Sequence, residues 1–240
     1  MRILWIEGCA DSALEEALRV LASVEEAFAF GQSQVMAMAV IPVLLWRGDD
    51  AAAAAVVERL VQHVRRHGQS FWSSWTHGFC RVLELRGIDV EDTRAQLLAP
   101  PRRTSAAAAD MLATLAAECL GPQQLERAEG GTVGWCAPEI LRVHAERLAS
   151  DPTRRGQAEA LLLRSLELSR QQGAAAWTLR AASSLAALWH GGDNTGHEDV
   201  PALQVWRQAT RDESPGAQAA EGKSQRSHGK KGCSKPPSPR

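Results

Sequence analysis

Apolar residues recur three or four positions apart along most of residues 1–190, which is the spacing of an amphipathic helix with one buried face. The clearest case spans 50–66, where the apolar stripe consists of Val57, Leu60, Val61 and Val64. Charged and polar residues occupy the other side: Glu58, Arg59, Gln62, Arg65 and Arg66. The same period predicts two further buried stripes, Ala158, Leu161, Leu162, Leu166 and Leu168 in 154–172, and Ala175, Leu179, Ala182, Ala186 and Trp189 in 174–190.

The whole pattern predicts a succession of short helices. They are expected near 2–7, 11–28, 32–47, 50–67, 70–86, 91–98, 105–120, 122–128, 136–149, 154–172 and 174–190. Pro42 falls inside one of them and predicts a kink or a break, because proline has no backbone N–H to donate. Pro100-Pro101 and Gly130-Gly131 predict two firmer breaks.

A repeat of about forty residues underlies these helices. Three segments resemble one another, Leu4–Gly8, Leu44–Gly48 and Leu83–Gly87, and their glycines are 40 and 39 residues apart. Glycine tolerates the left-handed conformation that ends a helix, so each segment predicts a helix end. A fourth copy of the ending, Leu188–Gly191, closes the last helix.

Helix starts are expected just after these glycines. Each is followed by an aspartate, Asp11, Asp49 or Asp89, which predicts capping of the next helix through free backbone N–H groups. Ser12 with Glu15 fits a capping box, and Asp151 before Pro152 marks another start. The predicted fold is all-α: an α-α superhelix of four to five tetratricopeptide-like helical hairpins, each burying a face against the next.

Composition supports helix and indicates a reducing compartment. Alanine and leucine dominate and tyrosine is absent, which favours helix over sheet. The five cysteines form no CxxC pair and are expected to be free thiols, so the chain is expected to be cytoplasmic. No signal peptide is expected, and the apolar stretch Met36–Trp46 is shorter than the ~20 residues of a membrane helix, so no membrane partner is expected.

Charge divides the chain in two. The net charge is −1, but Gly222–Arg240 carries six Lys and Arg residues and no acid. Residues 191–240 are rich in Gly, Ser and Pro and are expected to form a disordered basic tail after a repeat domain over 1–190. Weak nucleic-acid contact through this tail is one hypothesis that the charge leaves open.

Two blocks resemble bacterial signal-transduction ATPases. One runs from Ile41 to Asp49 and on to Gly68; the other includes Trp135–Arg142, Ser165–Ala174 and Trp177–Ala186. Those regulators join a winged-helix or cyclase domain and an ATPase to a tetratricopeptide-like solenoid. The resemblance covers about residues 4–190 and implies the solenoid part, with nucleic acid contacted through domains that this chain lacks.

Six residues form the candidate binding surface. Tryptophans at or near helix starts are expected either to wall a ligand groove or to pack between repeats: Trp72, which is not among the six, and Trp75, Trp135 and Trp177, which are. Three charged residues, Glu139, Arg142 and Arg180, lie among apolar neighbours in the family-like blocks. Their position indicates either a binding group or a buried ion pair between helices.

No motif points to catalysis. Gly222-Lys223-Ser224 lacks the spaced glycine and preceding strand of a phosphate-binding loop. His63 and His67 lack further ligands at metal spacing, and no pairing of Cys80 or Cys136 with His77 or His144 is evident, so these are expected to be packing residues. No catalytic residue, cofactor or metal is therefore expected.

The sequence thus predicts a non-catalytic binding or sensor module of a bacterial transcriptional regulator. Its partner is expected to be a protein, a peptide or a small effector. The alternatives are a stand-alone adaptor that bridges proteins, and a nucleic-acid binder that uses the tail.

Overall fold

The computed structural model describes residues 1–24, 28–99 and 103–190, which belong to one compact unit. Every regular element in these ranges is a helix, and no strand occurs in them. The all-α class is therefore confirmed for the described part of the chain. The predicted disordered tail over 191–240 lies outside it.

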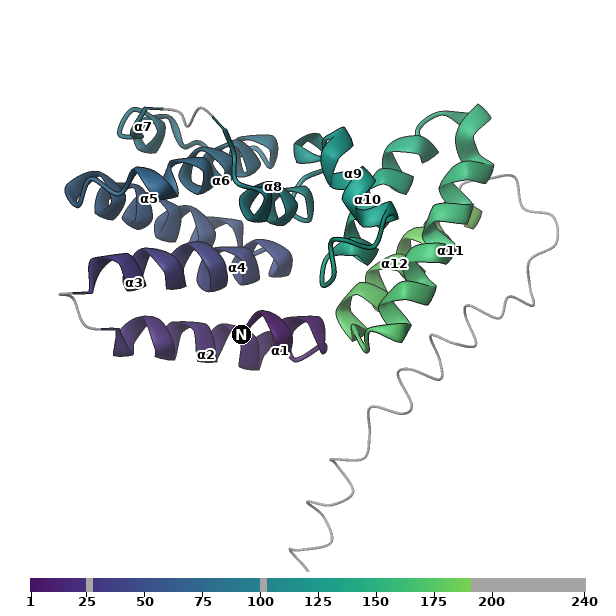
Figure 1. Cartoon of the computed structure of the whole chain (residues 1–240), viewed down its shortest axis with the longest axis horizontal. Helices are drawn as coiled ribbons and strands as arrows, with labels where there is room; N and C mark the ends of the chain where they lie inside the picture. Colours follow the sequence, from purple (N-terminus) through teal and green to yellow (C-terminus); the bar gives the residue numbers. More distant parts are fainter. Residues whose placement is uncertain (25–27, 100–102, 191–240) are drawn as a thin grey trace, which may run out of the picture. The chain divides into compact units, whose positions relative to one another are not determined.

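The helices follow one another with short connections (Figure 1). The α-helices are α1 (Arg2–Ile6), α2 (Ala10–Ser23), α3 (Ala29–Val35), α4 (Ile41–Arg47), α5 (Asp50–Arg66), α6 (Ser73–Leu85), α7 (Glu91–Arg94), α8 (Ala106–Ala113), α9 (Pro122–Glu129), α10 (Ala137–Ala149), α11 (Arg155–Gln171) and α12 (Ala175–His190). A π-helical turn, η1 (Met36–Val40), and three 3-10 turns complete them: η2 (Ser70–Trp72), η3 (Ala117–Cys119) and η4 (Pro152–Arg154). The eleven expected segments are all present, although 91–98 shrinks to α7 and 105–120 to α8 and η3.

The glycines of the repeat end helices in the same way. Gly8, Gly48 and Gly87 have positive φ angles of 96°, 82° and 77°. The next residue in each case donates its N–H to the carbonyl five positions back, from Cys9, Asp49 and Ile88 to Leu4, Leu44 and Leu83. This is the Schellman arrangement, which satisfies carbonyls that the helix end leaves free. The helix ends predicted at these three glycines are confirmed, and the fourth, at Gly191, lies outside the described residues.

The predicted caps are mostly wrong. Cys9 precedes α2 and makes no side-chain cap, so Ser12 lies inside the first turn and forms no capping box. Asp49 occupies the cap position of α5 without a cap bond, because its carboxylate accepts from Arg47 Nε at 2.8 Å. Two predicted aspartates do accept backbone N–H groups: Asp89 accepts from Glu91, and Asp151 caps η4 by accepting from Thr153.

A single apolar helix, formed by α3, η1 and α4, lies in the core. Pro42 does not break it. A π-helical turn lies just before the proline, and it accommodates a residue that has no backbone N–H to donate. Among the described residues, this helix, Ala29–Arg47, alone has the length and apolar composition to cross a membrane, and it is longer than the apolar stretch Met36–Trp46. Because 72% of its most apolar window is buried inside the protein, it has the character of a core helix.

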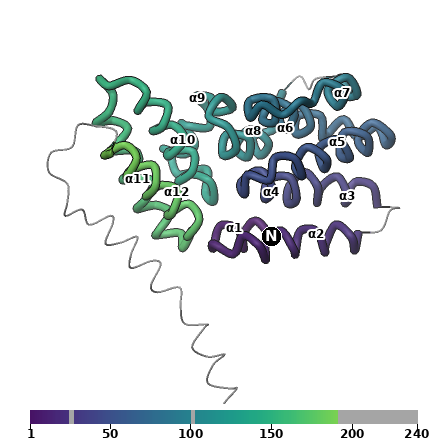
Figure 2. Tube along the Cα trace, turned by 180° about the vertical axis from the view of Figure 1, so that it is seen from behind, coloured from purple at the N-terminus to yellow at the C-terminus, as the bar shows by residue number. Residues whose placement is uncertain are grey.

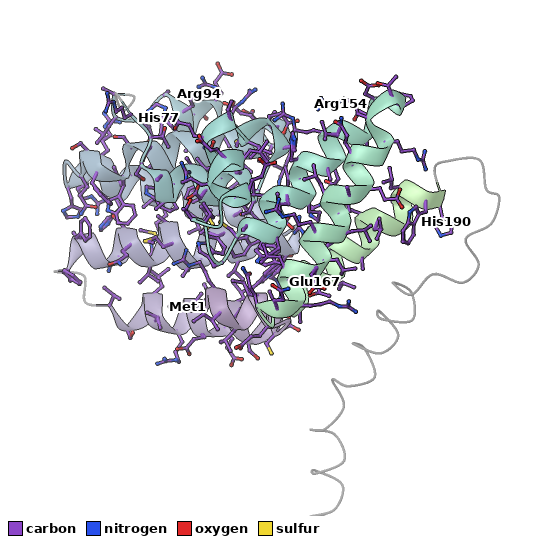
Figure 3. All side chains as sticks on the ribbon, turned by 45° about the vertical axis from the view of Figure 1, so that its right-hand side comes forward. Met1, His77, Arg94, Arg154, Glu167 and His190 are labelled. Carbon is purple, nitrogen blue, oxygen red and sulfur yellow. The ribbon has the colours of Figure 1, made fainter. Side chains whose placement is uncertain are left out.

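The helices pack in layers along the sequence. Figure 1 and the reverse view in Figure 2 show α1 and α2 beside α3 and α4, with α5 and α6 beyond them. At the other end, α10, α11 and α12 pack against one another, and the labels Arg154 and Glu167 in Figure 3 mark the course of α11. Helices that are neighbours in sequence are thus also neighbours in space.

The buried stripes are confirmed for α5 and wrong for α12. Val57, Leu60, Val61 and Val64 are buried, and the charged residues opposite are exposed. In α12 the buried residues are Trp177, Ala181 and Leu185, whereas Leu179 is 48% exposed. Alanines occur on several faces of this helix, and the buried face is the one that carries Trp177, the more deeply buried of its two tryptophans.

Two ion pairs recur at the same spacing. Arg47, which ends α4, donates from Nη1 to Asp11 Oδ1 of α2 at 2.5 Å, across 36 positions. Arg86, which follows α6, donates from Nη1 to Asp50 Oδ1 of α5 at 2.6 Å, also across 36 positions. Each arginine directly precedes a repeat glycine, so the sequence repeat is matched by a repeated contact.

Candidate functional site

Five of the six candidate residues come together where α10 and α12 pack. Trp135 directly precedes Cys136 and α10, which carries Glu139 and Arg142, while Trp177 and Arg180 lie in α12. Hydrogen bonds, an ion pair and a cation–π contact join them into one group, which we call the α10–α12 cluster.

Trp75 lies apart from the α10–α12 cluster. It belongs to α6 and is buried, and its ring centroid is 6.1 Å from that of Trp72 and 6.0 Å from that of Phe79. It belongs to the hydrophobic core, and these ring neighbours lie in η2 and in α6 itself. The sequence had no means of placing it, because Trp75 and α10 are distant along the chain.

Glu139 is the centre of the cluster. It is 0% exposed and lies in the first turn of α10, where the helix dipole favours a negative charge. Its two carboxylate oxygens accept from Arg142 Nε and Nη2, both at 2.8 Å. Oε1 also faces Arg180 Nη2 at 2.9 Å, which links α10 to α12. A buried carboxylate with two guanidinium partners is satisfied in the way that buried charge requires.

Arg142 extends the network toward the surface. Its Nη1 donates to Glu146 and, at 3.1 Å, to Ser184 Oγ, and Ser184 in turn donates to Glu146 Oε1 at 2.7 Å. Burial by itself lowers the pKa of Arg142, but the hydrogen bonds and charges of Glu139 and Glu146 outweigh it and the pKa is raised. Arg142 therefore stays charged, and it has acceptors in both helices.

Arg180 is less well compensated. Burial lowers its pKa, the charge of Glu139 acts in the opposite direction, and the nearby charge of Arg142 lowers it further. Its side chain is still 33% exposed, and its guanidinium lies 5.8 Å from the ring centroid of Trp177. Arg180 is thus the charged member of the cluster whose side chain reaches both buried Glu139 and solvent.

The tryptophans form the apolar side of the cluster. Trp177 is fully buried and donates from Nε1 to the carbonyl of Trp135 at 3.1 Å. Its ring centroid lies 4.7 Å from that of Trp5 and 5.5 Å from that of Trp46. Trp135 is only half-buried, and the guanidinium of Arg2 lies 5.2 Å from its ring centroid.

Trp5, Trp46 and Arg2 were not among the sequence candidates. A signal for two of them existed, since Trp5 and Trp46 stand in the repeat segments before Gly8 and Gly48, and their ring centroids are 4.8 Å apart. Nothing in the sequence indicated Arg2. Its contact with Trp135 depends on how α1 meets the start of α10, and burial lowers its pKa.

The other candidate chemistry has no support in the geometry. Burial raises the pKa of Cys80 to about 11, so its thiol is protonated at neutral pH, and burial also raises the pKa of Cys136. His77 Nε2 lies 2.9 Å from the carbonyl of Leu98. Residues 1–24, 28–99 and 103–190 contain no group of three or more His, Cys, Asp or Glu placed to hold a metal ion. Gly222-Lys223-Ser224 lies outside those ranges.

The cluster is chemically a buried ion pair between packed helices, the second of the two expectations for its charges. Glu139 and Trp177 have no exposed surface, so they can position the other members of the cluster but cannot contact a partner themselves. Trp135 and Arg180 keep exposed atoms and are the members able to touch a partner directly. Comparisons with known proteins supply no further assignment, because no protein-family model, curated protein or solved structure matches the chain.

Proposed function

We propose that this chain is a non-catalytic binding and sensor module, built as an α-α superhelix of tetratricopeptide-like hairpins. The observation that carries the proposal is the repeated ion pair, Arg47 with Asp11 and Arg86 with Asp50, each across 36 positions. Units stacked in one register make equivalent contacts at equivalent separations, as repeat proteins do. The left-handed glycine turns that end the matching helices support the same register: Gly8, Gly48 and Gly87.

A binding role suits the chemistry of the α10–α12 cluster better than catalysis does. Its carboxylate, Glu139, is buried and already shared between two guanidinium groups. Proton transfer or nucleophilic attack requires a group within hydrogen-bond reach of a substrate. The exposed atoms of Trp135 and Arg180 offer instead an aromatic face and a cation, which suit a protein, a peptide or a small anionic effector.

The place of this module in a bacterial transcriptional regulator rests on the resemblance. The resembling block from Ile41 to Gly68 forms α4 and α5, and the other blocks form parts of α10, α11 and α12. The charged residues of those blocks, Glu139, Arg142 and Arg180, meet in one network. A gene that encodes an ATPase and a winged-helix segment in frame upstream supports the regulator, and a gene that stands alone favours the adaptor.

Affinity capture with the full-length chain as bait tests the binding role. We expect a protein that the wild type and Arg19→Gln retain and that Arg180→Gln loses, because Arg180 reaches solvent and Arg19 is an exposed residue on α2. Melting of each variant checks that the fold persists. Capture that is identical for all three chains, or no specific capture, would count against a binding role for this cluster.

A further inference from the structure

Three exposed phenylalanines gather where α3 begins and η2 lies. Phe28, Phe30 and Phe71 are 59%, 43% and 62% exposed, and the ring centroids of Phe30 and Phe71 are 5.8 Å apart. We call these three residues the Phe patch. Phenylalanine side chains that gather at the surface of a folded protein commonly mark an interaction site.

The C-terminal end of α5 brings positive charge beside the Phe patch. His63 Nε2 lies 2.9 Å from the carbonyl of Ala29, between Phe28 and Phe30 in the sequence. Burial lowers the pKa of His63, and the nearby charges of His67, Arg66 and Arg59 lower it further. All three of these charged neighbours of His63 are basic, and all three side chains are exposed.

Beneath the rings lies the indole N–H of Trp72, a buried hydrogen-bond donor. Trp72 is 1% exposed, and its ring centroid is 5.3 Å from that of Phe30 and 5.0 Å from that of Phe71. Its Nε1–H is buried and makes no hydrogen bond within the described residues, and the same holds for Ser73 Oγ. A buried donor without an acceptor destabilises the protein, and an incoming acceptor recovers this loss.

We propose that the Phe patch docks an acidic peptide segment of another protein. Its apolar side chains would pack on Phe28, Phe30 and Phe71, and its carboxylates would face Arg59 and Arg66. A peptide carries a carbonyl acceptor at every residue, so displacement of Phe30 or Phe71 by an apolar side chain brings an acceptor to Trp72 Nε1.

A peptide fits these charges better than a lipid surface does. Membrane-binding basic segments use clusters of about 4–8 Lys and Arg residues. The Phe patch has two arginines and a histidine beside it, which is fewer basic residues than such a cluster contains. Glu25 and Glu26, which precede Phe28 in the sequence, lie outside the described residues. This inference names a partner class for the proposed binding module, and its residues lie on α3, α5 and η2, away from the α10–α12 cluster.

Selection from a random-peptide phage library on the full-length chain tests the proposal, with counter-selection on Phe71→Ser. Because Phe71 is 62% exposed, this variant leaves the core intact. We expect enriched sequences that combine Asp or Glu with large apolar residues. The absence of enrichment over Phe71→Ser, or enrichment of basic sequences, would overturn the proposal.

Fluorescence anisotropy with the best selected peptide then tests each contact. We expect Phe71→Ser and Arg66→Gln each to weaken binding about tenfold and added salt to weaken it further. Trp72→Phe, which keeps a ring and loses the donor, is expected to lower the melting temperature through lost packing and, at a temperature where the fold persists, to weaken peptide binding. The matched control is Leu163→Ser on α11, which removes another exposed apolar residue elsewhere and should change nothing.

Three outcomes separate this inference from its alternatives. Peptides that require Arg180 but not Phe71 would leave the proposed function standing and refute the Phe patch. Sedimentation with phosphatidylcholine–phosphatidylserine vesicles that is lost in Phe71→Ser would assign the patch to a membrane. Concentration-dependent dimerisation that is lost in Phe71→Ser would assign it to a second copy of this chain.

Discussion

Arg86 donates to Asp50 Oδ1 at 2.6 Å from the turn that follows α6 to the first residue of α5. The same guanidinium donates to the carbonyl of Leu45 at 2.8 Å and to that of Leu115 at 3.0 Å. One side chain thus connects α4, α5 and the segment after α8. Because Leu45 lies in the last turn of α4, its carbonyl accepts from the N–H of the cap residue Gly48 at 3.3 Å as well as from Arg86.

Replacement of Arg86 by methionine is the most direct test of this connection. The aliphatic part of the side chain is kept, while the three polar contacts with Asp50, Leu45 and Leu115 are lost. Hydrogen bonds that involve a charged group contribute about 1.5–3 kcal/mol each, and the lost contacts share one site. We expect the free energy of unfolding to fall by roughly 2–3 kcal/mol in urea denaturation monitored by circular dichroism.

The matched control is Arg19→Met on α2. Arg19 pairs with Glu16 within one helix, and its side chain is 66% exposed, so the loss is expected to stay below about 1 kcal/mol. Equal effects of the two substitutions would show that Arg86 does not hold these segments together.

Glu139 provides a second test, because two guanidinium groups depend on it. Its removal in Glu139→Ala leaves Arg142 and Arg180 next to each other, with Glu146 as the remaining carboxylate partner of Arg142. Loss of one partner of a buried ion pair typically costs about 3–5 kcal/mol, and we expect a value near the lower end because Arg180 is partly exposed. Urea denaturation measures the loss.

A double-mutant cycle and a control make this second test specific. Arg180→Met in the Glu139→Ala background is expected to recover part of the loss, because it removes one uncompensated charge. Glu146→Gln, whose side chain is 47% exposed, is expected to cost less than about 1 kcal/mol. Simple additivity of the Glu139 and Arg180 substitutions would mean that the two residues do not interact.

The order of the helices was predictable because the signals are local. A buried stripe such as Val57 and Val61 and a turn glycine such as Gly48 act within a few residues of themselves. The caps were not predictable in the same way. Asp49 has the side chain of a cap residue, but Arg47 competes for its carboxylate, and only the folded turn brings them together.

The site depends on contacts that sequence separation hides. Glu139 and Arg142 are three residues apart in one helix, so the sequence alone suggests that they pair. The pairing with Arg180 and the contact of Trp177 with Trp5 join distant segments, and nothing local specifies them. The prediction of the buried face of α12 was wrong for a related reason, since an alanine-rich helix has several apolar faces of similar area.

A pair of glycine substitutions tests the repeat turn. Gly48 has a φ angle of 82°, and a methyl group added to its Cα would meet no atom within 4 Å, so Gly48→Ala meets strain from the backbone alone. We expect a loss of about 1–2 kcal/mol. Gly156 lies in the first turn of α11 with a φ outside the left-handed region and equally open surroundings, so Gly156→Ala is expected to stabilise by about 0.5–1 kcal/mol. Thermal melting of both variants measures the difference, and a shift in the same direction for both would contradict the assignment of strain to the turn.

The pH dependence of stability tests the end of α5. Burial lowers the pKa of His63 below the ordinary value of 6.5, so the unfolded chain binds this proton at a higher pH than the folded protein does. Between that ordinary value and the lowered one, the unfolded state holds more protons, and the free energy of unfolding falls as the pH falls. Burial lowers the pKa of His144 as well, so the two contributions add.

We therefore expect the stability at pH 7.5, measured in urea, to be largely retained down to about pH 6.5 and to decline below it. His63→Gln removes one of the two contributions and should flatten the decline. Gln62→Ala, an exposed neighbour without a titratable group, should keep the wild-type profile. A profile of His63→Gln that coincides with that of the wild type would mean that protonation of His63 is not linked to folding. In that case the contact between His63 and Ala29 would contribute to the surface beside the Phe patch without making it sensitive to acid.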